Sequence, residues 1–135
     1  MKVLIASALI VFSLVANAEC YLVGELQGYQ TSKSNNYDFV SSGFSDQEFQ
    51  INIDGPRSFV APRGKEKCSE INRNGIICSF MEGSKSKFEI WSFDLNRNVV
   101  VYSGHRTGFD LEVDGNVVEL DGAFVFTGKI IGKCK

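Results

Sequence analysis

Hydrophobic and polar residues alternate along most of the chain after residue 19, in short runs separated by turn-forming residues. Residues 48–53 show the pattern best, because Phe49, Ile51 and Ile53 fall on one face of an extended segment. No window of helical length keeps an apolar period near 3.6 residues. The pattern predicts an all-β fold, a small antiparallel barrel or sandwich of about eight strands. The expected strands are 20–29, 37–40, 48–53, 57–61, 68–71, 76–81, 87–94, 99–103, 109–113, 116–120 and 123–131.

The hairpin around residues 95–98 predicts an aromatic cluster. A four-residue turn there places Trp91 opposite Tyr102 and Phe93 opposite Val100. On this face Trp91, Phe93 and Tyr102 form part of the core or, if the sheet closes into a barrel, line a cavity for a small ligand.

Residues 21–28 and 124–132 share an order of aromatic, apolar, glycine and charged residues. This similarity favours pairing of the first and last strands and closure of the sheet, against the alternative of chance similarity in a β-rich sequence.

Four cysteines predict two disulfides. Cys68 and Cys78 flank residues 72–75, a strong hairpin turn, so they can face each other across a ladder. Pairing of the first and last strands brings Cys20 near Cys134, and we favour these two bonds among the three possible connectivities. The chain has no C-x-x-C motif, and its cysteine spacing does not fit a zinc site.

The first 18 residues have the form of a secretory signal peptide. Lys2 precedes an apolar stretch, and residues 16–18 form an A-x-A cleavage site. Cleavage leaves residues 19–135 as a single β domain. A bacterial lipoprotein usually has Gly or Ala directly before its lipidated cysteine, whereas Glu19 precedes Cys20 here. We therefore expect a periplasmic or secreted protein with no membrane anchor after cleavage.

The composition of the chain argues against several classes of function. The net charge of −2 argues against a broadly basic nucleic-acid binder, and the single histidine excludes any site that needs two. No glycine-rich phosphate loop enters a helix, so we expect no nucleotide or other cofactor. Sixteen acidic residues make many carboxylate pairs, so the pairs alone do not identify a hydrolase.

Residues 110–121 nearly match a calcium-binding EF-loop. The same residues fit a β-hairpin better, with Asp114-Gly115 as its turn and Leu111 opposite Val118. We favour the hairpin and expect no metal. The calcium alternative would use Asp110, Glu112, Asp114 and Asp121.

Residues 103–109 are expected to form a loop on a rigid, disulfide-linked scaffold, and such loops often bind partners. The candidate binding residues are Ser103, Gly104, His105, Arg106, Thr107, Gly108 and Phe109. Ser103-Gly104 followed by Gly108-Phe109 resembles a motif of the periplasmic inhibitors of C-type lysozyme. It departs from that motif in two ways: its aromatic residue is a phenylalanine, and residues 105–107 form a His-Arg-Thr spacer. The resemblance implies a small barrel in which Ser103 and Arg106 reach the enzyme's catalytic carboxylates.

The sequence therefore predicts a non-enzymatic binding protein. The most specific hypothesis is an inhibitor or immunity factor whose loop plugs the active site of a periplasmic or extracellular cell-wall-degrading enzyme, such as a lysozyme-like enzyme or an amidase. The alternatives are a carrier of a small apolar ligand in a barrel cavity and a periplasmic hydrolase.

Overall fold

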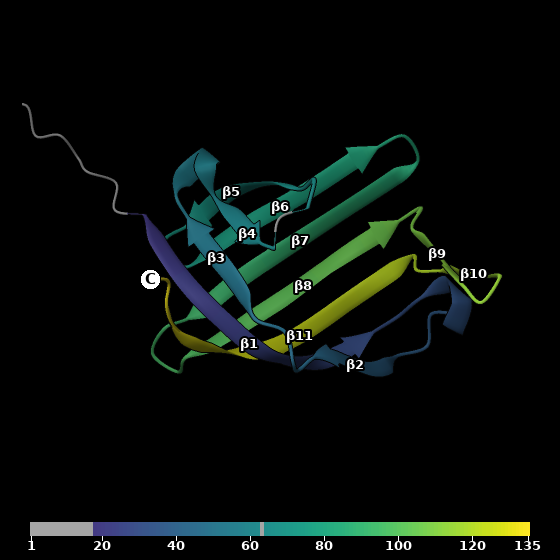
Figure 1. Cartoon of the computed structure of the whole chain (residues 1–135), viewed down its shortest axis with the longest axis horizontal. Coiled ribbons are helices and arrows are strands. Elements are labelled where there is room, and N and C mark those ends of the chain that lie inside the picture. Colours follow the sequence, from purple (N-terminus) through teal and green to yellow (C-terminus); the bar gives the residue numbers. More distant parts are fainter. Residues whose placement is uncertain (1–17, 63) are drawn as a thin grey trace, which may run out of the picture.

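The computed structural model describes residues 18–62 and 64–135, and it confirms an all-β fold (Figure 1). Apart from Ala18, the expected signal peptide lies outside the described residues. In this part of the chain no helix is long and apolar enough to cross a membrane. The strands are β1 (Glu19–Gln30), β2 (Val40–Phe44), β3 (Phe49–Ile53), β4 (Phe59–Ala61), β5 (Lys67–Asn72), β6 (Gly75–Glu82), β7 (Lys85–Asp94), β8 (Val99–Thr107), β9 (Asp110–Val113), β10 (Asn116–Glu119) and β11 (Gly122–Lys133); two short 3-10 helices are η1 (Lys33–Asn35) and η2 (Gly55–Arg57).

Nine strands form one antiparallel sheet that curls into a nearly closed barrel (Figure 1). Eight of these strands follow the order β4-β3-β1-β11-β8-β7-β6-β5, and the ninth, β2, pairs with β1. β4 approaches β5 where the sheet would close. The first half of β1 pairs with β3 and its second half with β2. The change of partner coincides with a register shift between Gly24 and Gln27, where Glu25 takes a positive φ of 54°. This irregularity bends β1 around the barrel.

Pairing of the first and last strands is confirmed, and so are both disulfides. β1 pairs with β11, and Cys20 bonds to Cys134 with a Cα–Cα distance of 5.3 Å. Cys68 lies directly opposite Cys78 in the β5–β6 ladder and bonds to it. Two disulfides and no free cysteine in the described chain indicate an oxidising environment.

The barrel interior differs between its two ends. At one end Val23, Ile51, Ile76 and Val100 are fully buried in an apolar core. Side chains alternate between the faces of a strand, so the inward row of β7 continues from Phe93 through Trp91 and Glu89 to Lys87. The same face therefore changes from apolar to charged along one strand, and the charged end carries the candidate site.

Two strands begin two or more residues later than expected. The strand expected at 37–40 is β2, which begins at Val40, because Asn36 and Tyr37 have positive φ values and continue the preceding turn. The strand expected at 57–61 begins at Phe59, since Pro56 lies in η2.

The expected hairpin at 110–119 is confirmed as a separate two-stranded sheet, with Leu111 opposite Val118 and Asp110 opposite Glu119. Glu119 also forms a 2.8 Å ion pair with Lys33, which offsets the repulsion from Asp110. The hairpin projects from one end of the barrel (Figure 1).

Candidate functional site

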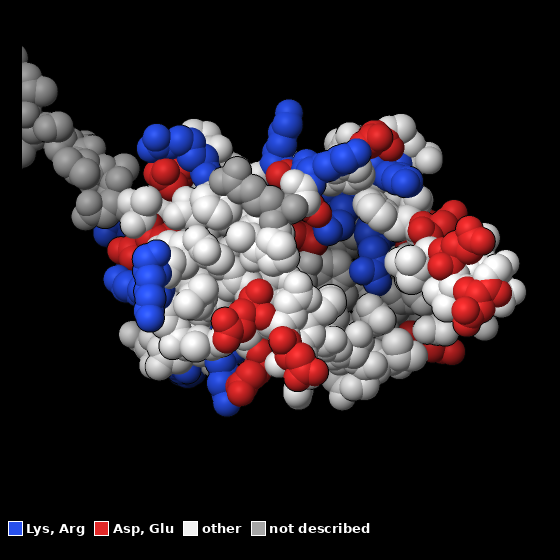
Figure 2. Space-filling view, in the orientation of Figure 1, with Lys and Arg blue, Asp and Glu red and all other residues white. Residues whose placement is uncertain are grey.

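A cavity of about 870 Å³ lies between the inner face of β6–β8 and the segments around β3 and β4. Figure 2 shows a hollow in this side of the molecule, beside the acidic β9–β10 hairpin. Its wall is aromatic on one side and charged on the other. The lining residues include Phe44, Phe49, Val60, Glu66, Lys67, Lys87, Glu89, Trp91 and Tyr102.

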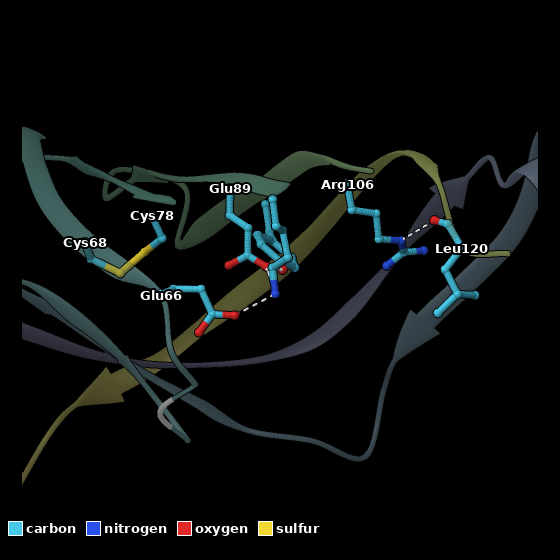
Figure 3. A network of polar contacts seen from close by, with 8 residues as sticks. Glu66, Cys68, Cys78, Glu89, Arg106 and Leu120 are labelled. Atoms are coloured by element: carbon cyan, nitrogen blue, oxygen red, sulfur yellow. Dashed lines mark hydrogen bonds and ion pairs between the residues drawn. A yellow bond between two sulfur atoms is a disulfide. The ribbon is translucent and has the colours of Figure 1, made fainter. Parts of the chain in front are cut away.

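The charged wall is a hydrogen-bonded network centred on Lys87 (Figure 3). Lys87 Nζ lies 2.8 Å from Glu66 Oε1 and 2.7 Å from Glu89 Oε1. The Tyr102 hydroxyl donates to Glu89 Oε1 at 2.5 Å. Glu89 and Tyr102 come from neighbouring strands, whereas Glu66 precedes β5 and brings the loop after β4 against the sheet. The network therefore ties that loop to the cavity wall.

The network fixes the charge states of its members. Burial raises the pKa of Glu66, but the hydrogen bond from Lys87 and further contacts outweigh it, so the pKa lies below the ordinary 4.5. Burial lowers the pKa of Lys87, yet hydrogen bonds to its two glutamates leave the pKa above 10.5. Burial and the charge of Glu89 raise the pKa of Tyr102. At neutral pH the cavity thus holds an ammonium, a carboxylate at Glu66 and a neutral phenol.

Trp91 forms the floor of the cavity. Its ring stacks on Tyr102 with centroids 3.8 Å apart, and Phe49 lies 5.5 Å away on a tilted plane. The indole Nε1–H is buried and has no hydrogen-bond partner among the described residues. A buried donor without an acceptor costs free energy, so this N–H is an unusual feature of the residue at the cavity floor.

The aromatic cluster is confirmed, with Trp91 opposite Tyr102 and Phe93 opposite Val100. Trp91 and Tyr102 belong to the buried core and also line the cavity, whereas Phe93 belongs to the core alone. Phe93 lies nearer the packed end, where the Tyr21 ring covers it at 5.1 Å.

The expectation of a loop at 103–109 is wrong over 103–107. These residues continue β8, which pairs with β7 on one side and β11 on the other, so they cannot project as a plug. Only Gly108 and Phe109 lie between strands, and both amides donate to Asp121 Oδ1. Alternation then divides the candidates: Ser103, His105 and Thr107 face outward, while Gly104 and Arg106 share the inward face of Tyr102.

Arg106 lies inside the barrel mouth (Figure 3). Its Nε donates to the Leu120 carbonyl at 2.7 Å and its Nη2 to Gln30 Oε1 at 3.1 Å. The guanidinium also lies 5.6 Å from the centre of the Phe124 ring. Lys87 is its direct neighbour on β7, so Arg106 adjoins the charged wall of the cavity.

The four calcium candidates do not form an EF-loop, because β8 and β11 stand where flanking helices would be required. Asp110 and Glu112 lie on β9, Asp114 is in the turn and the Asp121 carboxylate caps two backbone amides. Among residues 18–62 and 64–135 no group of three or more His, Cys, Asp or Glu residues is placed to hold a metal.

Sequence reasoning did not identify Glu66, Lys87 and Glu89 as site residues. A signal for two of them was present, because Lys87 and Glu89 continue the alternating row of Trp91 and Phe93 in a strand expected from residue 87. Glu66 carries no such signal, since it reaches the network from a loop distant in sequence.

The chain matches no protein family, no curated protein and no solved structure. A pocket with an aromatic floor and a few fixed polar groups is suited to binding. The low pKa of Glu66 opposes a role as general acid in glycoside hydrolysis, which needs one carboxyl group protonated.

Proposed function

We propose that this protein is an exported, non-enzymatic binding protein that holds a small ligand in its barrel cavity, in the periplasm or outside the cell. The observation that carries the proposal is the cavity of about 870 Å³, whose floor is Trp91 with an unpartnered buried N–H. Cavities of 300–1,000 Å³ that combine an aromatic surface with a few polar groups are typical of small-molecule sites.

The charged network also supports binding. Lys87 and Glu89 pair with each other, Lys87 also pairs with Glu66, and Glu89 accepts a hydrogen bond from Tyr102. Their side chains are therefore fixed before a ligand arrives. A preorganised site loses less conformational entropy on binding than a mobile one. The proposal takes up the barrel carrier, which was the alternative to the inhibitor in the sequence analysis. It changes the ligand, which meets polar groups as well as an apolar wall.

The test is a titration with N-phenyl-1-naphthylamine, a neutral aromatic probe that becomes fluorescent in apolar sites. We expect saturable binding with energy transfer from Trp91, the single tryptophan of the chain. Phe44→Ala removes part of the aromatic wall, where Phe44 lies 5.5 Å from the Phe126 ring, and should weaken binding by about tenfold.

The matched control is Phe88→Ala. Phe88 is exposed to a similar degree as Phe44, 46% against 39%, but points outward from β7. The control should bind the probe like the wild type. Absence of saturable binding, or equal loss in both variants, would refute binding in the cavity.

A second candidate function is inhibition of a cell-wall-degrading enzyme, and the outer face of the sheet favours it. Ile90, Ser103, Val125 and Tyr29 form one continuous row across β7, β8, β11 and β1. The three hydrophobic members are exposed, and exposed apolar patches of this kind mark protein-binding surfaces. Ser103 would then contact the enzyme from a flat face rather than from an inserted loop.

This second function is tested by adding the mature, oxidised protein to a C-type lysozyme and measuring lysis of bacterial cell walls. Inhibition that Val125→Asp abolishes and Phe44→Ala does not would support it. Full lysozyme activity at a large excess of the protein would count against it.

A further inference from the structure

Arg106 is a cation of the barrel mouth whose charge no neighbouring carboxylate balances. Within residues 18–62 and 64–135 it forms no ion pair, and both of its side-chain hydrogen bonds go to neutral acceptors, Leu120 O and Gln30 Oε1. Its Nη1 group has no partner in the described chain. A guanidinium carries five N–H donors in a planar fork, so an acidic group can still bind to it by two parallel hydrogen bonds.

The three contacts of Arg106 also fix its position. β1 supplies Gln30, β11 supplies the Phe124 ring and the segment before β11 supplies the Leu120 carbonyl. An arginine held in this way is preorganised for an anion, since little side-chain entropy remains to be lost on binding.

Arg106 does not line the cavity itself but borders it, because it lies opposite Lys87 and on the same inward face as Tyr102. Gly104 separates Arg106 from Tyr102 along the inward face of β8, and the Phe124 ring fills the space beside it. Phe124 lies 4.8 Å from the Tyr102 ring and 5.6 Å from the Arg106 guanidinium, measured to ring centres. The Phe124 ring therefore bridges the cavity wall at Tyr102 and the guanidinium, and no charged group lies in this chain of contacts.

The charged wall sets the orientation of such a ligand. Lys87 is already bonded to Glu66 and Glu89, so an incoming anion would have to displace a carboxylate there. The two glutamates repel negative charge from that side. An acidic group is thus directed away from Lys87 and toward Arg106.

We infer that the ligand of this cavity is an amphipathic anion, with its acidic group on Arg106 and its apolar part against Tyr102, Trp91 and Phe44. The inference rests on the proposed function, because it names the ligand class of the same site.

The experiment compares lauric acid with lauryl alcohol, which share one alkyl chain and differ in charge, as competitors that displace N-phenyl-1-naphthylamine. We expect the acid to bind the wild type about tenfold more tightly than the alcohol at neutral pH. Arg106→Gln should remove this preference by lowering the affinity for the acid to that for the alcohol. Arg97→Gln is the matched control, because Arg97 is an exposed arginine in a surface ion pair with Asp94, and it should keep the preference.

Gln30→Glu provides a second variant, for use if Arg106→Gln fails to fold. It places a carboxylate where Gln30 Oε1 accepts from Arg106, so it should neutralise the guanidinium and abolish the preference while the arginine remains. Equal affinity of the wild type for acid and alcohol, or a preference that survives the Arg106 or Gln30 change, would overturn the inference. Failure of the neutral probe to bind the wild type would instead refute the proposed function itself.

Discussion

At the scale of single residues, the site depends on a charged group inside an otherwise apolar barrel. Glu89 has a side chain only 7% exposed and is acceptable there because Lys87 and Tyr102 both bond to its carboxylate. Burial of an unpaired carboxylate costs several kcal/mol, so these bonds permit the charge rather than add a large net stability.

Removal of the central lysine should expose this dependence. Lys87→Met leaves Glu66 and Glu89 without their shared partner and should lower the free energy of unfolding by about 3 kcal/mol or more. Urea denaturation at neutral pH measures the change. Lys129→Met is the control, since Lys129 pairs with Glu25 on the surface and its loss should have no measurable effect. Equal stability of Lys87→Met and the wild type would contradict the described network.

Acidification should weaken the same network through Glu66. Its pKa is lower in the folded protein than the ordinary 4.5, so the ionised form stabilises the fold above that value. The stability is lost as the pH falls from 4.5 through the lower folded pKa. Urea midpoints measured across this range should fall less steeply for Glu66→Gln than for the wild type. Parallel curves would show that Glu66 is not ionised against Lys87.

At the scale of elements, hairpins form wherever alternation and turn sequence agree. The residues that face each other across β5–β6, β7–β8 and β9–β10 could all be predicted, because a period of two and a defined turn leave one register. The position at which β8 ends could not be predicted. Residues 104–107 read as a polar, glycine-containing loop, but two neighbouring strands satisfy their backbone groups and extend the strand. That extension decides which face each side chain takes, and so it moves Arg106 into the barrel.

The β9–β10 hairpin should be the least stable element of the sheet structure. Its strands pair only with each other, and ties such as the ion pair Lys33–Glu119 hold it from outside. Backbone amides of 110–119 should exchange with solvent faster than those of 87–94 and 99–107. Amide hydrogen exchange followed by NMR measures this difference, and equal protection of the two hairpins would contradict it.

At the scale of the whole molecule, the two disulfides constrain chain segments of very different length. Cys20 and Cys134 are separated by 114 positions, whereas Cys68 and Cys78 are separated by 10. Both bonds could be predicted, one from a turn and one from the repeated glycine pattern. Part of the aromatic lining of the cavity could be predicted, but Glu66 and Phe44 could not, because they come from distant segments to meet β7 and β8.

Loss of the long-range disulfide should destabilise the protein more. Closure of the longer loop removes more unfolded-state entropy, so replacement of Cys20 and Cys134 by alanine should cost about 5 kcal/mol. The same change at Cys68 and Cys78 should cost about 3 kcal/mol from chain entropy. Denaturation of the two double variants under oxidising conditions tests the order, and a larger loss for the short bridge would contradict this account.

The most direct test of a ligand-binding barrel is the NMR signal of the Trp91 indole N–H. The chain has one tryptophan, so the signal is unambiguous, and the proton has no partner among residues 18–62 and 64–135. Saturation of uniformly ¹⁵N-labelled protein with N-phenyl-1-naphthylamine should shift this signal together with the amides of Lys87, Glu89 and Tyr102. An unmoved indole signal, with shifts confined to the outer face around Val125 and Tyr29, would contradict binding in the cavity.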